Sequence, residues 1–174
     1  MEKIAKFEKV SFEQFKKDSE HIVLTSSNII TEEDLKKTYE HIKLPERKTL
    51  GSAGYDFCTP FGFNFEPSKN HNSLLIPTGI RCKISEGYVL LLYVRSSLGI
   101  KQKVTLSNGT GVIDSDYYFA DNEGHILISL SFNQVTHIKP FDRIVQGVFV
   151  PFGITTDDDV TTKRTGGIGS TGKE

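Results

Sequence analysis

The chain has 174 residues and a mass of 19.5 kDa, which suits one domain, and its 37% of hydrophobic residues supplies a modest core. Its formal net charge of −1 and pI near 6.5 exclude a broad basic field for a nucleic-acid polymer, so any phosphate binding must be local. Two cysteines without a C-x-x-C pair and five histidines without metal-ligand spacing argue against a zinc site or a disulfide scaffold. Because neither a signal-peptide pattern nor an apolar stretch of membrane-spanning length occurs, we expect a soluble, cytoplasmic protein with reduced thiols.

Residues 1–43 are predicted to form an arm of mixed structure. Its first apolar residues alternate with polar ones, as in a strand, and Ser11 followed by Gln14 is a capping-box signal for a short helix. A second capping pair, Thr31 and Asp34, precedes apolar residues at helical spacing and predicts a helix that ends before the next proline. We expect this arm to pack on the rest of the chain.

From Gly51 onward the sequence consists of short apolar runs separated by turn residues. The runs are 55–58, 74–76, 80–84, 88–94, 126–132 and 144–152. Runs of this length with glycine, asparagine and proline between them are typical of strands joined by turns. Residues 44–163 are therefore predicted to form one all-β domain, a many-stranded barrel or sandwich.

A polar segment follows directly on the apolar run 89–94. Arg95, Ser96 and Ser97 place a guanidinium group and two hydroxyls at the end of a predicted strand. Arginine can bind phosphate oxygens in a bidentate manner, and serine donates a hydrogen bond without bulk. The same residues also suit a polar turn that ends a strand, and the segment alone does not decide between the two.

A second polar segment combines the hairpin signal Asn108-Gly109 with a carboxylate that follows the apolar pair Val112 and Ile113. At this place Asp114 could be partly enclosed and could take a proton from water. The alternative is that Asp114 accepts hydrogen bonds from the backbone of a turn, as aspartates in turns usually do.

The last apolar run begins after two charged residues. Asp142 and Arg143 are predicted to form an ion pair at the start of this strand, rather than a site. Gln146 is the unexpected polar residue within the run.

The chain closes on a glycine-rich run that satisfies G-x-G-x-x-G over residues 167–172. The dinucleotide-binding form of that motif must open a helix, and only two residues follow it here. Glycines that allow φ > 0 can instead turn successive N–H groups inward as an anion nest, and Arg164, Ser170 and Thr171 add donors for phosphate. Residues 164–174 are therefore predicted to be a flexible phosphate-binding tail, with a disordered terminus as the alternative.

Five segments occur in an order that belongs to a known family: LPERKTLGSAGYDF, RSSLGIK, GVIDSDY, DRIVQ and RTGGIGSTG. They spread from Leu44 to Gly172, and the chain resembles the trimeric deoxyuridine triphosphatases, especially those of Gram-positive bacteria and their phages. The resemblance implies a jelly-roll-like (β-clip) barrel that hydrolyses dUTP to dUMP and pyrophosphate. It also implies a homotrimer with three sites at subunit interfaces, where the tail of one subunit closes over nucleotide held by the others.

The resemblance assigns roles in the chemistry to the central motifs. Asp114 is implied as the general base that orients and deprotonates the water attacking the α-phosphorus. Ser96 corresponds to the hydroxyl near the oxygen that bridges the α- and β-phosphates, and Ser97 would offer its backbone N–H nearby. Arg95 would either contact phosphate or brace a neighbouring carboxylate.

Mg²⁺ is the cofactor that the resemblance implies, bound mainly by the phosphates of the substrate. Because Mg²⁺ keeps several waters, Asp56 and Gln146 would hold its water shell and the phosphates through hydrogen bonds, without being direct ligands. Asp56, acting through water, is therefore the metal-site residue that the resemblance implies.

The hairpin before Asp114 is implied to select the base and the sugar. Asn108 and the backbone of Val112 and Ile113 would face the uracil edge, where the amino group of cytosine would leave buried groups unpaired at a cost of ~1–3 kcal/mol each. Tyr117 would pack beneath the deoxyribose and close the space that a 2′-hydroxyl needs.

The tail is also implied to bind substrate, with one departure from the family. Its implied contacts are Arg164, Ile168, Gly169, Ser170 and Thr171. Ile168 stands where the family usually carries an aromatic residue that stacks on uracil, and an isoleucine cannot stack. Residues 118–125 are longer than usual and are predicted to form a longer hairpin. We hypothesise that Tyr118 or Phe119 in that stretch supplies the missing ring.

Two other functions fit parts of the sequence. A deoxycytidine triphosphate deaminase shares the Arg-Ser-Ser segment, but its reaction needs a glutamate on the strand after the aspartate motif, and residues 126–133 contain no carboxylate. A non-catalytic regulator would keep the nucleotide pocket and bind a protein partner through the charged N-terminal arm. Assays of dUTP and dCTP hydrolysis separate these alternatives.

Overall fold

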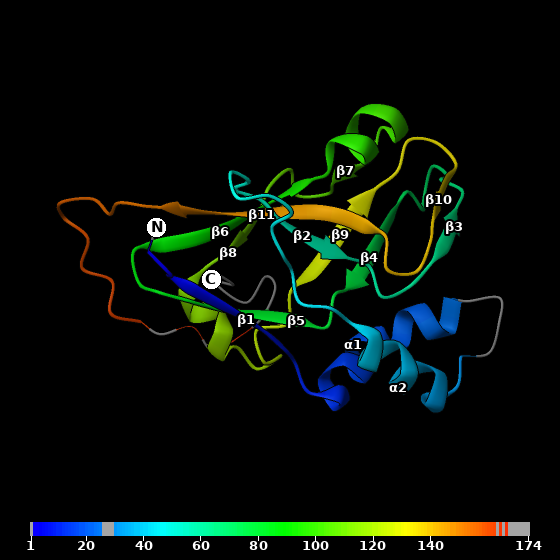
Figure 1. The fold of residues 1–174 in the computed structure, drawn as a ribbon, viewed down its shortest axis with the longest axis horizontal. Helices are drawn as coiled ribbons and strands as arrows, with labels where there is room; N and C mark the ends of the chain where they lie inside the picture. Colours follow the sequence, from blue (N-terminus) through cyan, green and yellow to red (C-terminus); the bar gives the residue numbers. More distant parts are fainter. Residues whose placement is uncertain (1, 26–29, 163, 165, 167–174) are drawn as a thin grey trace.

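The computed structural model describes residues 2–25, 30–162, 164 and 166, and its architecture is mostly β, as the sequence predicted (Figure 1). The strands are β1 (Ala5–Lys9), β2 (Tyr55–Cys58), β3 (Phe63–Phe65), β4 (Ser73–Pro77), β5 (Ile80–Ile84), β6 (Tyr88–Val94), β7 (Thr105–Leu106), β8 (Gly111–Ile113), β9 (Leu127–Ser131), β10 (Thr136–Ile138) and β11 (Arg143–Pro151). The helices are α1 (Phe12–Thr25), α2 (Glu32–His41), the π-helical turn η1 (Ser97–Lys101) and the 3-10 turn η2 (Ser115–Phe119). In the described part of the chain, each helix is too short or too polar to cross a membrane.

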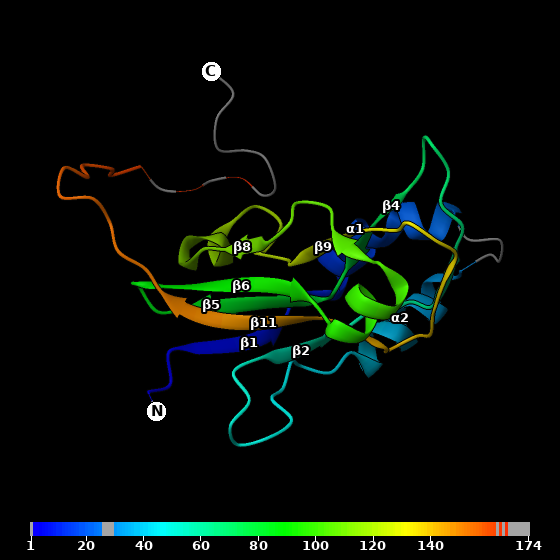
Figure 2. The same cartoon turned by 90° about the horizontal axis from the view of Figure 1, so that it is seen from above.

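Antiparallel pairing arranges the strands in two main sheets and two smaller pairs. One sheet has the order β2-β11-β6-β8, the other has the order β4-β9-β7, and β1 pairs with β5 while β10 pairs with β3. Strand β11 is central because it pairs with β2 over residues 143–147 and with β6 over residues 145–151 (Figure 2). Its register sets Gln146 between Asp56 of β2 and Tyr93 of β6, which brings two predicted site residues to adjacent strands.

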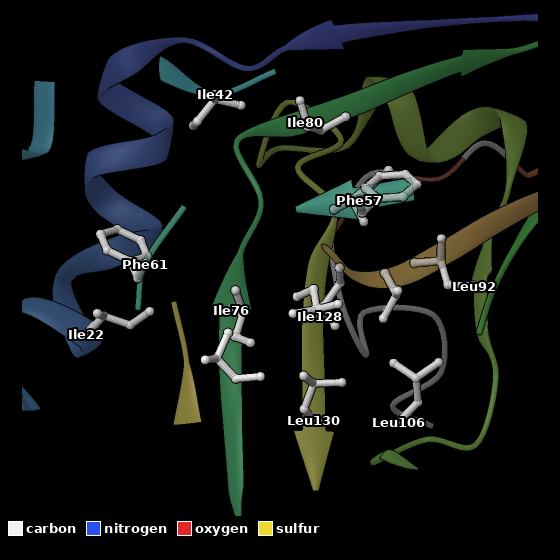
Figure 3. Close-up of a cluster of buried hydrophobic side chains, with 14 of the residues drawn as sticks. Ile22, Ile42, Phe57, Phe61, Ile76, Ile80, Leu92, Leu106, Ile128 and Leu130 are labelled. Atoms are coloured by element: carbon white, nitrogen blue, oxygen red, sulfur yellow. The ribbon is translucent and has the colours of Figure 1, made fainter. Parts of the chain in front are cut away.

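The core lies between the sheets and beneath the arm. Strands β6 and β9 alternate, so that Leu90, Leu92, Ile128 and Leu130 point inward and are almost wholly buried. Figure 3 shows side chains from β4, β6 and β9 gathered in this interior. Full burial of such a side chain contributes about 1.5–3 kcal/mol, so the two sheets are held mainly by apolar contact.

The N-terminal arm is built into the same core. Strand β1 pairs with β5, and helix α1 stacks Phe15 on Phe61 with ring centroids 5.8 Å apart. The capping box predicted for α2 is confirmed, because Thr31 and Asp34 exchange side-chain to backbone hydrogen bonds of 3.1 Å. Figure 1 shows both helices covering one end of the β domain.

The cap of α1 differs from the prediction. Ser11 Oγ accepts from the Gln14 N–H (3.1 Å), but the Gln14 side chain donates to Asp18 (2.8 Å) instead of returning to Ser11. Glu123 takes that place, accepting from both the N–H (2.7 Å) and the hydroxyl (2.6 Å) of Ser11. A carboxylate 112 residues away therefore completes the cap, and α1 runs to 14 residues where a short helix was expected.

The longer hairpin predicted over residues 118–125 is also wrong. The 3-10 turn η2 leads into an irregular loop in which Glu123 and Gly124 adopt φ of 58° and 69°. A side chain at position 124 would meet the backbone of Tyr117 at 2.6 Å, so only glycine fits there. The loop turns toward the arm instead of pairing as two strands.

Candidate active site

A pocket of about 420 Å³ lies beside β8 and brings most of the predicted base and sugar contacts together. Asn108, Val112, Ile113 and Tyr117 all line it, and so does Arg164 from the tail. Its floor is apolar and comes from β6, β7 and β9. A pocket with an apolar floor and a few polar groups at its rim is the usual form of a small-molecule site.

Two glycines shape the turn between β7 and β8 and the strand that follows it at this pocket. Gly109 has φ of 75°, a conformation that glycine adopts readily, and its N–H donates to the carbonyl of Leu106 (3.0 Å). A Cβ at Gly111 would lie 3.0 Å from the Cβ of Leu92, so the missing side chain lets β8 approach β6 closely. The turn predicted at Asn108-Gly109 is confirmed, but the hairpin is not, because β7 pairs with β9 and β8 pairs with β6 instead of with each other. The backbone of β8 borders the pocket.

Asp114 is the first residue after β8, directly follows the pocket-lining Ile113, and is half exposed. Arg164 Nη2 donates to its Oδ2 at 2.8 Å, and Nε of the same guanidinium donates to Asp116 Oδ1 at 3.1 Å. The guanidinium carbon also lies 5.6 Å from the centre of the Tyr117 ring. Asp116 was not among the predicted site residues, and the GVIDSDY motif alone gives no sign that its second aspartate shares a cation with the first.

Tyr117 is buried at the base of the pocket, and its hydroxyl is fixed. It donates to the His125 carbonyl oxygen at 2.8 Å and accepts from Asn122 Nδ2 at 2.9 Å. Burial raises the pKa of Tyr117, so the phenol stays neutral near pH 7. The ring is therefore a rigid apolar surface with its polar end turned away from the pocket.

A second cluster of predicted residues surrounds Asp56 on β2. Arg95 Nε lies 3.1 Å from Asp56 Oδ1, and Arg143 Nη1 donates to Oδ2 at 2.9 Å, so each carboxylate oxygen has a cationic partner. Arg95 thus forms an ion pair with a carboxylate, which is one of the two roles that the sequence analysis left open for it. Gln146 is the register partner of Asp56, and its side chain fills the space that a Cβ at Gly54 would take.

The ion pair predicted between Asp142 and Arg143 is wrong. Asp142 Oδ2 accepts from the backbone N–H of Lys139 (2.9 Å), while Arg143 turns across to Asp56, 87 residues earlier. The β2–β11 register decides this pairing, and no local pattern in the sequence contains that information. Arg143 is therefore a residue of this cluster that the sequence analysis missed.

Ser96 and Ser97 follow the end of β6 and are both exposed. The N–H of Arg95 donates to the Ile144 carbonyl (3.1 Å), and Leu98 is buried beneath the turn η1, which fixes the segment on the domain. Their hydroxyls therefore face outward from a rigid strand end.

The two clusters lie at opposite ends of β6. Ile113 pairs with Leu90, so Asp114 lies near the beginning of β6, whereas Arg95 follows its end. Six residues of extended strand separate the position of Asp114 from that of Arg95 along β6, which corresponds to roughly 20 Å. Figure 1 shows η2 and η1 correspondingly far apart. Within one copy of the chain, Asp114 and Ser96 are not brought together.

Some predicted contacts remain untested by the geometry. Ile168, Gly169, Ser170 and Thr171 lie outside the described residues.

Tyr118 was suggested as a replacement ring, but it lies against the arm and outside the pocket lining. Its hydroxyl donates to Glu8 (2.6 Å), and the guanidinium carbon of Arg81 lies 4.5 Å from the centre of its ring. Phe119 is 73% exposed.

Comparison with known proteins gives consistent matches. A family model described as dUTPase matches residues 40–172. The deoxyuridine 5'-triphosphate nucleotidohydrolase of Lactococcus lactis is 42% identical over 136 residues, covering 75% of this chain and 89% of that protein. The crystal structure of the Streptococcus mutans dUTPase superposes with a TM-score of 0.58 at 37% identity, covering 64% of this chain and 88% of that one. A dUTPase from phage phi11 of S. aureus, described with a structural Mg(II) ion, has the same fold at 24% identity and a TM-score of 0.57, covering 71% of this chain and 92% of that one.

Proposed function

We propose that this chain, which belongs to the dUTPase family, binds dUTP in the pocket beside β8 and uses Asp114 to activate the water that cleaves it. Family membership makes the chain a dUTP diphosphatase, which forms dUMP and pyrophosphate. The observation that carries the assignment of the site is the position of Asp114, which directly follows Ile113 and is hydrogen bonded to Arg164. Both neighbours line the pocket, together with Asn108, Val112 and Tyr117.

Recognition of uracil follows from the exposed backbone of β8. The base offers an acceptor, a donor and a second acceptor along one edge, which the N–H and C=O groups of Val112 and Ile113 and the amide of Asn108 can match. Cytosine would replace an acceptor by an amino donor and leave a buried group unpaired, at ~1–3 kcal/mol. The Tyr117 ring, buried and fixed through its hydroxyl, would support the deoxyribose and exclude a 2′-hydroxyl.

Asp114 acts on the water that attacks the α-phosphorus. A carboxylate positioned as a general base typically contributes ~10²–10⁴ in rate. Arg164 is paired with Asp114 and Asp116, so binding of the triphosphate would draw this guanidinium from the carboxylates to the phosphates. Asp114 would then be free to accept a proton. Gly169, Ser170, Thr171 and the apolar side chain of Ile168 would complete the tail's closure over the nucleotide.

The second half of the site would come from another copy of the chain. Because Arg95, Ser96 and Ser97 lie roughly 20 Å from Asp114 along β6, one substrate cannot meet both ends within one subunit. Ser96 of a neighbouring copy would stabilise the oxygen that gains charge as pyrophosphate leaves, with the Ser97 N–H nearby. This separation supports sites shared between copies of the chain, and the resemblance to the trimeric dUTPases makes a homotrimer the proposed assembly.

The residues present fit Mg²⁺ held chiefly by the substrate. No group of three or more His, Cys, Asp or Glu side chains suited to a metal ion occurs among the residues that the structure describes. Both oxygens of Asp56 already accept from arginines, so this carboxylate suits contact through water, and Gln146 adjoins it. Bound Mg²⁺ would neutralise phosphate charge at the reacting centre. The free thiols of Cys58 and Cys82 support a reducing, cytoplasmic location.

Release of pyrophosphate from dUTP and dCTP, measured with magnesium, tests this proposal. We expect hydrolysis of dUTP and roughly tenfold slower hydrolysis of dCTP, because cytosine would leave a buried group unpaired. We expect no deamination of dCTP, because β9 brings Leu127, Ile128 and Ser129 to the pocket and no carboxylate. Formation of deoxyuridine nucleotide from dCTP would instead identify a deaminase. Binding of dUTP without turnover would identify a regulatory protein.

A further inference from the structure

We propose that helix α1 of the N-terminal arm positions Tyr117 through Asp18 and His125, and thereby sets how strongly the enzyme prefers dUTP to UTP. Asp18 and His125 are positioning residues, because neither lines the pocket. The inference rests on the proposed role of Tyr117 beneath the deoxyribose. Asp18 also lies outside residues 40–172, the part that the dUTPase model matches.

His125 is the central group of this connection. Its side chain is wholly buried, and both ring nitrogens are engaged: the Gly79 N–H donates to Nε2 at 2.7 Å, and Nδ1 lies 2.5 Å from Asp18 Oδ2. Because Nε2 accepts a hydrogen bond, we assign the proton to Nδ1, which then donates to Asp18. The carboxylate on α1 therefore fixes both the tautomer and the orientation of the ring.

Asp18 is held in turn so that its charge can stay in a partly buried place. Burial opposes the charged form, but hydrogen bonds from His125 and from Gln14 Nε2 (2.8 Å) outweigh it and lower the pKa of this carboxyl. Without Asp18 the buried Nδ1–H of His125 would lose its acceptor, and the ring would have to shift to find another.

The connection ends at the nucleotide pocket. The backbone carbonyl of His125 accepts from the Tyr117 hydroxyl at 2.8 Å and from Asn122 Nδ2 at 3.3 Å. A shift of His125 therefore moves the group that anchors the Tyr117 ring. A loosened ring can yield to a ribose 2′-hydroxyl, so the loss should appear in discrimination between sugars.

Two further contacts hold the same loop to the arm without reaching Tyr117. Tyr118 is hydrogen bonded to Glu8 of β1, and Glu123 accepts from Ser11 at the start of α1. The Ser11 contact provides a control: the Ser11→Ala substitution weakens both the cap of α1 and the attachment of the arm to the loop, but it removes no hydrogen bond of the Asp18–His125–Tyr117 series.

The test compares kcat/KM for dUTP and for UTP in the parent, Asp18→Ala, Asp18→Asn and Ser11→Ala enzymes. We expect the dUTP-to-UTP ratio of kcat/KM to fall roughly fivefold in Asp18→Ala, an effect within the range of one lost buried hydrogen bond, mainly through a higher kcat/KM for UTP. Asp18→Asn keeps an acceptor for Nδ1–H and should restore most of the ratio. Ser11→Ala should lower Tm and leave the ratio unchanged.

An unchanged ratio in folded Asp18→Ala, or an equal fall in Ser11→Ala, would overturn the proposal. If Asp18→Ala does not fold, Tyr117→Phe decides, because it removes the hydroxyl at the other end of the series: a lower ratio supports the proposal and an unchanged ratio overturns it. A parent enzyme that leaves dUTP intact would refute the proposed function itself, which is a different outcome from a ratio that stays constant.

Discussion

Arg164 donates to Asp114 across 2.8 Å, so a cation of the tail neutralises the carboxylate to which the chemistry is assigned. The same guanidinium binds Asp116 and lies over the Tyr117 ring. One side chain thus occupies the edge of the pocket through contacts that a triphosphate could exchange for stronger ones. Arg164 by itself therefore links the tail to the site.

Replacing Arg164 by alanine should raise KM for dUTP by roughly 10- to 100-fold, the range of a lost hydrogen bond to a charged group. Arg164→Lys keeps the charge but not the planar fork, and should recover part of the affinity. Steady-state kinetics with dUTP measure both variants. A KM unchanged in Arg164→Ala would mean that this guanidinium does not bind substrate.

Gly111→Ala should destabilise the fold by about 1–3 kcal/mol and lower kcat/KM, because the new Cβ would meet Leu92 at 3.0 Å and push β8 from β6. Gly51→Ala is the matched control, since a Cβ there meets nothing within 4 Å. Urea denaturation and dUTP kinetics of the two variants make the comparison. Equal behaviour of both would contradict the close approach of the strands.

Stability should fall in acid partly because of Glu8. Hydrogen bonds from Lys6 and Tyr118 lower its pKa from 4.5 to about 2. A depressed carboxyl pKa stabilises the fold above the unfolded value, and this contribution is lost as the pH falls from about 4.5 towards 2. Urea denaturation of the parent and of Glu8→Gln at pH 5 and pH 3 should show a smaller acid-induced loss in the variant. An identical loss in both would remove Glu8 from the explanation.

The two thiols should differ in reactivity. Burial raises the pKa of Cys82 to about 12, and Cys82 is almost wholly inaccessible, whereas Cys58 is half-buried with a less strongly raised pKa. Iodoacetamide labelling at pH 8, followed by peptide mass spectrometry, should modify Cys58 slowly and Cys82 only after denaturation. Faster labelling of Cys82 in the folded protein would contradict the packing of β1 on β5.

Sharing of sites between copies can be tested by mixing two inactive variants. If Asp114 of one subunit works with Ser96 of another, then Asp114→Asn and Ser96→Ala chains refolded together should regain about a quarter of the parent activity, because that share of sites receives both intact residues. If each site were built within a single chain, the mixture would show no activity beyond the sum of the activities of the two variants.

The sequence predicted what is local and missed what depends on register. The turn at Asn108-Gly109 could be predicted directly, because its residues are contiguous, but the sequence did not show that the flanking strands β7 and β8 pair with β9 and β6 instead of forming a hairpin. The partners Asp56 and Arg143 are separated by 87 residues and meet only through the pairing of β2 with β11. The periodicity of the sequence does not encode such a contact. Neither charged residue is distinguished by its local sequence, and only the register of the two strands shows that they meet.

The hairpin predicted for the loop before β9 was wrong for a related reason. Its length indicated a hairpin, but Glu123 and His125 are held by Ser11 and Asp18 of the arm, 112 and 107 residues away. Tertiary hydrogen bonds replaced the strand pairing that local turn signals suggested. The same contacts connect the arm, through the His125 carbonyl, to Tyr117, which lines the pocket.

The most direct test of the account is pyrophosphate release from dUTP with magnesium by the parent enzyme and by Asp114→Asn, which differs from it by the loss of one charge. We predict that the parent hydrolyses dUTP and that Asp114→Asn retains the fold, judged by circular dichroism, but loses ~10²–10⁴ in kcat. Equal rates in the two proteins would contradict the role of Asp114, and a parent that leaves dUTP intact would contradict the function as a whole.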